Sequence, residues 1–98
     1  MRDEIAATLG DVFWSDLRAH VERDAVIVVS EGLDLVDVGV AVASNDVEEV
    51  DGWINAGQMA KPTPEDLARW PLDATLRFSS VIVKPYVLIR RPVPPTLS

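Results

Sequence analysis

The single histidine of the chain, His20, carries the side chain best suited to acid–base catalysis. Asp16 lies four residues before it and Asp24 four residues after it, so a carboxylate on the same predicted helix could orient the imidazole ring. No Ser-His-Asp arrangement for nucleophilic catalysis is evident from the sequence. We therefore favour a structural role for His20 and keep it as the only catalytic candidate.

Two tryptophans flank the turn over residues 61–64, and together with its polar side chains they could line a pocket. Indole rings beside an ammonium group and a hydroxyl group suit a planar or anionic ligand. The candidate ligand-binding residues are Trp53, Lys61, Thr63 and Trp70. The alternative, which we favour, is that both tryptophans anchor the core and that Thr63 caps a helix beginning at Pro64.

Metal ions and phosphate cofactors are not indicated. The chain has no cysteine and one histidine, so thiolate sites and a zinc-binding histidine pair are excluded. The acidic group over residues 46–51 lacks the spacing of a calcium-binding EF-hand loop and fits the first turn of a helix. The glycines are too dispersed for a phosphate-binding loop. No metal and no cofactor is therefore expected.

Composition and charge define the class of protein. The 98 residues, 48% hydrophobic and 26% charged, suit one globular domain with a single core. The net charge of −7 disfavours nucleic acid and anionic membranes as partners. Neither a signal peptide nor an apolar run of about 20 residues is present, so a cytoplasmic location is expected.

The charges are unevenly distributed along the chain. Residues 25–60 hold acidic side chains and no basic ones, whereas residues 61–98 are net basic. This asymmetry suggests that the basic C-terminal segment lies against the acidic middle, within one chain or between two copies.

The elements that position these residues follow from the hydrophobic pattern. Residues 25–29 form a continuous apolar run, typical of a strand covered on both faces. From residue 35 to 43, valines alternate with other residues, which predicts a second strand joined to the first by a hairpin. On such a strand Asp34 and Asp37 point to opposite faces and cannot form a catalytic pair. Small residues such as Gly39 on one face indicate close packing.

Helical segments are predicted on both sides of this hairpin. They cover residues 3–9, 11–23, 47–56 and 64–70. The third helix follows a capping cluster at 44–46, ends before Gly57, and buries a face formed by four residues. These are Val47, Val50, Trp53 and Ile54.

The last predicted element is one long strand over residues 78–91, bent at Pro85 with part of its edge unpaired. The expected fold is α+β, a small mainly antiparallel sheet of about three strands with helices packed on it, in the order α-α-β-β-α-α-β. Residues 1–91 form the domain, and residues 92–98 form a proline-rich, disordered tail.

The long strand also predicts self-association. It carries apolar side chains on both faces beside an unpaired edge, and a two-fold dimer is the commonest way to cover such a surface. Basic residues of the strand could meet the acidic stretch of a second copy. The predicted interface residues are Lys84, Pro85, Tyr86 and Arg90.

A scattered motif runs through most of the chain. It consists of Trp14-x-x-Leu17-x-x-His20-x-x-Arg23-Asp24, Leu33-Asp34-Leu35, Trp53-Ile54-x-x-Gly57, Lys61-Pro62-Thr63 and Ile82-Val83-x-Pro85-Tyr86-Val87-Leu88-Ile89. This motif resembles an uncharacterised bacterial family of stand-alone proteins of about this size, known only as a domain of unknown function. The resemblance covers residues 2 to about 90. It implies a free-standing bacterial cytosolic protein, and it implies no activity, cofactor or substrate.

The sequence by itself does not identify a biochemical function. The expected class is a non-enzymatic binding or regulatory module that self-associates, most simply as a homodimer, or that binds another protein. The alternative is a small-molecule-binding protein or a modest enzyme with a pocket near Trp53, Lys61, Thr63 and Trp70, and with His20 as its acid–base group.

Overall fold

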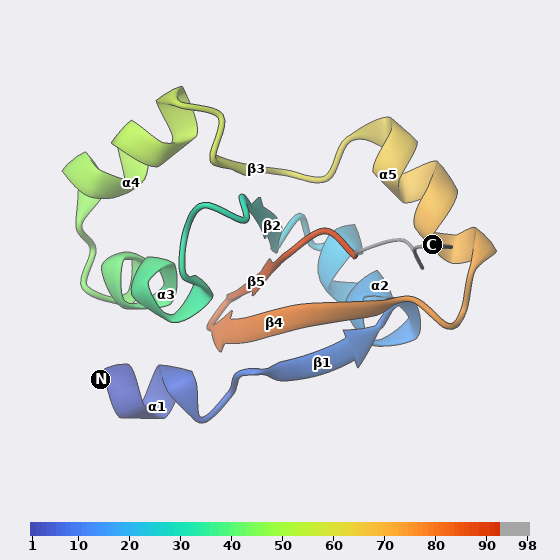
Figure 1. Cartoon of the computed structure of the whole chain (residues 1–98), viewed down its shortest axis with the longest axis horizontal. Helices are drawn as coiled ribbons and strands as arrows, with labels where there is room; N and C mark the ends of the chain where they lie inside the picture. The colour runs from blue at the N-terminus through green and yellow to red at the C-terminus, as the bar shows by residue number, and fades with distance from the viewer. Residues whose placement is uncertain (93–98) are drawn as a thin grey trace.

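Within residues 1–92, five strands form one mixed sheet in the order β1-β4-β5-β2-β3, seen in the computed structural model of Figure 1. The strands are β1 (Gly10–Phe13), β2 (Val26–Val29), β3 (Met59–Ala60), β4 (Arg77–Val83) and β5 (Tyr86–Ile89). The helices are α1 (Arg2–Ala6), α2 (Trp14–Glu22), α3 (Leu35–Ala43), α4 (Val47–Asn55), α5 (Pro64–Arg69) and the 3₁₀ turn η1 (Trp70–Leu72). The structure describes residues 1–92, so the predicted tail lies, except for Pro92, outside the described residues.

The predicted α+β class is confirmed, but the predicted sheet is wrong in two respects. It has five strands instead of three. It is also mixed, because β2 runs parallel to β5, with Val26 opposite Val87, while the other pairs are antiparallel. Sequence patterns do not give strand direction here, because the two parallel neighbours lie about 60 residues apart in the chain.

Side chains alternate between the two faces of the sheet and create two separate core clusters. On one face, Val81 and Leu88 pack with residues of α1 and α3 such as Ile5 and Val38. On the other face, the core consists of residues from α2, η1 and the strands, among them Leu17, Trp70, Phe78 and Ile89. Helices therefore cover both faces of the sheet, as Figure 1 shows.

The predicted strand over residues 35–43 is wrong, because this segment is helix α3. The side chain of Asp34 caps the helix, with its Oδ1 atom accepting hydrogen bonds from the backbone N–H of Val36 (2.8 Å) and Asp37 (3.1 Å). Asp34 and Asp37 therefore both lie at the start of helix α3, and they do not point to opposite faces of a strand as predicted. Packing of this nearly all-apolar helix over the sheet outweighs the strand preference of its valines.

The predicted long strand at the C-terminus is also wrong. Residues 84 and 85 form a turn between β4 and β5, with Val83 opposite Tyr86 and a cis Lys84–Pro85 peptide bond, the arrangement of a type VI turn. Both strands lie inside the sheet, between β1 and β2. The unpaired strand edge expected at Pro85 is therefore absent from the described structure.

Two short strands were not predicted. The sequence predicts that the second helix begins at residue 11, but residues 10–13 form β1 beside β4. The Asp16 carboxylate accepts a hydrogen bond from the backbone N–H of Phe13 (2.9 Å), so α2 begins only at Trp14. The two-residue strand β3 gives no periodic signal because it is so short.

The third predicted helix, α4, has the expected limits but a smaller buried face. Asp46 caps it, and Gly57 follows it with φ of 75°, as expected for a helix-ending glycine. Val50 and Trp53 pack against the core. Val47 and Ile54 are 57% and 50% exposed, so the prediction that they are buried is wrong.

Candidate functional site

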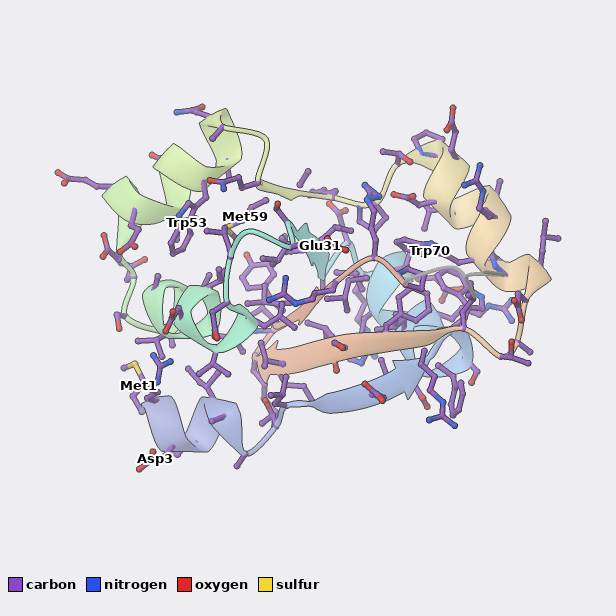
Figure 2. The ribbon with its side chains drawn as sticks, viewed as in Figure 1. Met1, Asp3, Glu31, Trp53, Met59 and Trp70 are labelled. Carbon is purple, nitrogen blue, oxygen red and sulfur yellow. The ribbon has the colours of Figure 1, made fainter. Side chains whose placement is uncertain are left out.

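An open groove of about 810 Å³ lies over the sheet face that carries α3 and α4. Ile27 of β2 and Leu88 of β5 belong to the strands beneath it. The apolar side chains contributed by α3, α4 and β3 are Val42, Val50, Ile54 and Met59. Figure 2 shows Met59 and Trp53 close together next to α4, and both belong to the core cluster under the groove.

Charged residues line the groove at the end of α2 and at the β4–β5 turn. The C-terminal end of α2 contributes His20, Arg23 and Asp24, and the turn contributes Lys84. Lys61, which follows β3, completes the charged lining. Apolar and charged residues of the groove therefore come from different elements.

The end of α2 is shaped by local hydrogen bonds. Asp24 has φ of 61°, and its backbone N–H donates to the Val21 carbonyl oxygen (2.9 Å). The N–H of Ala25 donates to the carbonyl oxygen of His20 (2.9 Å). These two bonds form a Schellman motif, in which an aspartate occupies the position that glycine usually takes. The motif turns the chain from α2 into β2.

The charges along the groove are only partly neutralised. The Lys61 ammonium group forms an ion pair with the Asp24 carboxylate. Among the described residues, neither Arg23 nor Lys84 has a carboxylate oxygen within 4.0 Å. Three cationic side chains and one carboxylate, with His20 neutral, leave a local charge of +2 on a chain of net charge −7.

His20 lies half-buried in this groove, but the carboxylates expected to orient it are used elsewhere. Asp16 accepts the hydrogen bond from Phe13 at the start of α2, and Asp24 pairs with Lys61. No serine or threonine is among the described residues that line the groove. The described lining therefore offers His20 no serine or threonine hydroxyl group to activate.

The four predicted ligand-binding residues do not line one cavity of the described chain. Trp53 packs against the α3 side of the sheet, and Lys61 alone reaches the groove. Trp70 is 3% exposed on the opposite face, where its ring meets Phe78 edge-on at 5.0 Å. Figure 2 shows Trp53 near α4 and Trp70 near the end of α5, well separated.

Thr63 caps helix α5, as predicted. Its Oγ1 atom accepts a hydrogen bond from the N–H of Asp66 (3.1 Å), and the Asp66 carboxylate accepts one from the N–H of Thr63 (2.9 Å). This reciprocal pair is a capping box, with Pro64 in the first helical position. The structure therefore gives Thr63 the role of a helix cap, through hydrogen bonds to a residue three positions away.

The four predicted interface residues occupy two different environments. Lys84, Pro85 and Tyr86 are exposed at the β4–β5 turn, beside the groove. Arg90 points inward, where its guanidinium donates hydrogen bonds to the carbonyl oxygens of Ser30 (3.0 Å) and Leu33 (2.5 Å). Arg90 thus holds the loop between β2 and α3.

The basic C-terminal segment lies against the acidic middle of the same chain through Arg90, but within residues 1–92 it forms no ion pair with a carboxylate of that middle. Within residues 1–92, Arg91 forms its ion pair with Asp66 of α5 (2.9 Å), outside the acidic stretch. The acidic stretch pairs instead with the N-terminus, through Arg2 and Asp37 (2.5 Å). Exposed pairs of this kind contribute little stability.

Three carboxyl groups with shifted pKa lie outside the groove. A hydrogen bond from the backbone of Asp37 lowers the pKa of Asp34, and the Thr75 hydroxyl group lowers that of Asp73. Desolvation raises the pKa of Glu49, with a further contribution from Asp46. These groups lie at helix starts and turns, so their shifts indicate local structure. No grouping of potential metal ligands occurs among the described residues.

The sequence did not predict the groove, because its lining spans residues 20–88 and comes from six helices and strands and the β4–β5 turn. The motif segments around His20-x-x-Arg23-Asp24 and at Lys61 contribute to its charged side, and the Pro85-Tyr86 segment also lines the groove. These motif segments were the sequence signal that could have pointed to the groove. Using that signal would have required knowing that α2, β3 and the β4–β5 turn lie side by side in the fold. Within residues 1–92, no helix has the length and apolar character needed to cross a membrane.

Comparisons with known proteins agree on the fold and identify a family. The NMR solution structure of PA1075 from Pseudomonas aeruginosa matches with a TM-score of 0.75 and 26% sequence identity, covering 96% of this chain and 86% of that one. The search of curated proteins found no match. The family described as "Protein of unknown function (DUF2288)" matches residues 1–91. The expected resemblance is therefore confirmed, and this chain belongs to the DUF2288 family.

Proposed function

We propose that this protein is a non-enzymatic binding module whose groove holds a small molecule with an apolar body. The observation that carries the proposal is the groove itself, about 810 Å³ with an apolar lining from β2, α3, α4, β3 and β5. Small-molecule sites typically measure 300–1,000 Å³ and combine such a lining with a few polar groups. Among the described residues, no serine or threonine that could serve as a hydrolase nucleophile lines the groove.

Exposed apolar side chains at the groove support this proposal. Ile54 is 50% exposed and Tyr86 is 40% exposed, although both line the groove. A ligand lying between them would remove their apolar surface from water, at about 25 cal/mol for each Å² buried. An aliphatic chain would gain about 0.8 kcal/mol for each methylene group that it buries.

An uncharged probe tests the groove without involving its charges. We expect 1-octanol to raise the melting temperature and to shift backbone amide resonances of β2, β5 and α4, because it binds the folded state. Ile54→Ser should weaken this binding. Val47→Ser is the matched control, since Val47 is similarly exposed on the same helix but does not line the groove. Equal affinities of the two variants, or no shift up to the solubility limit of octanol, would contradict the proposal.

Self-association is the second proposed property, and the open edge of the sheet favours it. Among the described residues, strand β1 pairs with β4 alone. Leu9, just before β1, and Phe13, its last residue, are 52% and 42% exposed. Exposed strand edges with apolar side chains invite pairing with another chain. Antiparallel pairing of two β1 strands would give a two-fold dimer.

Light scattering over a range of protein concentrations tests this second proposal. We expect a dimer mass that falls to the monomer mass on dilution, and a weaker dimer for Phe13→Ser. Leu72→Ser is the control, because Leu72 is 84% exposed in η1 and is not part of β1. A monomer mass that persists from micromolar to millimolar protein would exclude the dimer.

A further inference from the structure

We infer that the groove selects molecules that carry one anionic group, such as a carboxylate, at the end of an apolar body, and that Arg23 and Lys84 recognise this group. This inference rests on the function proposed above and adds the chemical class of the ligand. Three features of the described residues support it: the separation of charged and apolar lining, the absence of ion-pair partners for two cations, and the bonding at the end of α2.

The first feature, the separation of charged and apolar lining, determines how a ligand would be oriented in the groove. The groove is apolar where α3, α4 and β3 line it, and cationic where the end of α2 and the β4–β5 turn line it. A molecule with one charged end and one apolar end matches this division. Its apolar body would lie against Val50, Ile54 and Leu88, and its anionic group would lie beside Arg23 and Lys84.

The second feature is that two of the three cations in the groove have no carboxylate partner among the described residues. The chain has 16 acidic and 9 basic residues, so carboxylates are plentiful, yet none lies within 4.0 Å of Arg23 or Lys84 in the described structure. Lys61, the third cation of the groove, is already paired with Asp24. Arg23 and Lys84 are therefore the two basic side chains available to an anion in the groove.

The third feature keeps the Arg23 side chain available. Backbone donors already occupy the carbonyl oxygens of Ala19, His20 and Val21 near the end of α2, which accept from the N–H groups of Arg23, Ala25 and Asp24 respectively. The guanidinium makes no hydrogen bond within the described residues, while its position at the C-terminus of α2 favours a positive charge. A guanidinium can bind a carboxylate through two parallel hydrogen bonds, and Lys84 would add a point charge.

Octanoate and 1-octanol form the matched pair of probes, because they share an eight-carbon chain and differ in charge. Binding is measured by amide resonance shifts of the full chain at neutral pH. We expect octanoate to bind about tenfold more tightly than octanol. The preference should fall as salt is raised to about 0.5 M, since salt screens exposed charges.

The double variant Arg23→Gln, Lys84→Gln should bind octanoate and octanol equally, with the octanol affinity of the wild type retained. That retained affinity shows that the variant is folded with an intact groove. Arg69→Gln is the control for net charge, because Arg69 is an exposed cation of α5 outside the groove, and it should keep the full preference for octanoate.

The outcomes separate this inference from the function on which it rests. If octanol binds and octanoate binds no more tightly, the inferred anion selectivity is wrong while the apolar groove stands. An unchanged preference in the double variant, or equal loss in Arg69→Gln, would also overturn the roles of Arg23 and Lys84. If neither probe binds in the groove, the proposed function itself is wrong.

Discussion

Gly39 of α3 packs so closely against Ile5 of α1 that a Cβ atom at position 39 would lie 2.8 Å from the Ile5 Cγ2 atom. The same Cβ atom would lie 3.2 Å from Cγ2 of Val83 in β4. Glycine within a helix costs about 0.5–1 kcal/mol relative to alanine. Helices α1 and α3 and strand β4 approach so closely at Gly39 that a side chain does not fit there, which explains why a glycine is used despite this cost.

Alanine substitutions at two helical glycines should therefore have opposite effects. We expect Gly39→Ala to lower the free energy of unfolding by about 1–3 kcal/mol, because the added methyl group overpacks the core. Gly52→Ala in α4 should raise it by about 0.5–1 kcal/mol, since a Cβ atom there meets nothing within 4 Å. Urea unfolding measures both, and a stabilising Gly39→Ala would show that Ile5 and Val83 move aside easily.

The capping box of α5 predicts a difference between two conservative changes. Thr63→Ala removes the oxygen that accepts the Asp66 N–H and should cost about 1 kcal/mol of stability. Thr63→Ser keeps that oxygen and should cost little. Equal losses in thermal unfolding would instead indicate a role for the threonine methyl group or a ligand contact.

Strand β2 should not tolerate a charge at its buried positions. Val28 is 6% exposed between β5 and β3, and an unpaired buried carboxylate is strongly unfavourable. We expect Val28→Asp to yield insoluble protein. Ile82→Asp, at a strand position that is 44% exposed, should remain soluble. Soluble Val28→Asp with the wild-type melting temperature would contradict the buried position of β2.

Asp34 should contribute to the loss of stability in acid. The backbone N–H groups of Asp37 and Val36 lower its pKa below the ordinary value of 3.8, so the folded state binds a proton less readily than the unfolded state. The resulting stability is present above pH 3.8 and is lost as the pH falls through the lower pKa of the folded state. Asp34→Asn keeps an oxygen that can cap α3 but cannot titrate, so its melting temperature should fall less between pH 7 and strong acid.

Asp51→Asn is the control for this prediction. Asp51 is exposed on α4 and forms no hydrogen bond or ion pair through its side chain within the described residues. Its replacement should leave the acid dependence of the melting temperature as in the wild type. If Asp34→Asn shows the full wild-type loss as well, the capping hydrogen bonds of Asp34 do not control acid unfolding.

Local signals in the sequence predicted the parts of the fold that depend on a few neighbouring residues. The cap at Thr63, the helix limits at Asp46 and Gly57, and the buried strand near Val28 all agree with the structure. Each depends on hydrogen bonds within four residues or on a short apolar run, so the chemistry is visible in the sequence. The resemblance to the family was also evident from the sequence. The description of that family names no activity.

Only the tertiary structure decided the elements whose pattern fits two conformations. The valine-rich segment around Gly39 has the alternation of a strand, but it packs as a helix onto the sheet and α1. Residues 78–91 read as one strand, because the turn at Pro85 lacks the glycine or asparagine that marks ordinary hairpins. In both segments, the conformation depends on which other elements of the fold cover the apolar side chains.

The groove was likewise decided by tertiary structure. Arg23 and Lys84 are 61 residues apart in the chain, and each alone has the sequence context of an ordinary surface cation. They line one groove because β5 pairs with β2, which brings the β4–β5 turn beside the end of α2. Composition and local hydrogen bonds do not encode such a pairing, since it forms between strands that are distant in sequence and is stabilised by burial of the whole core.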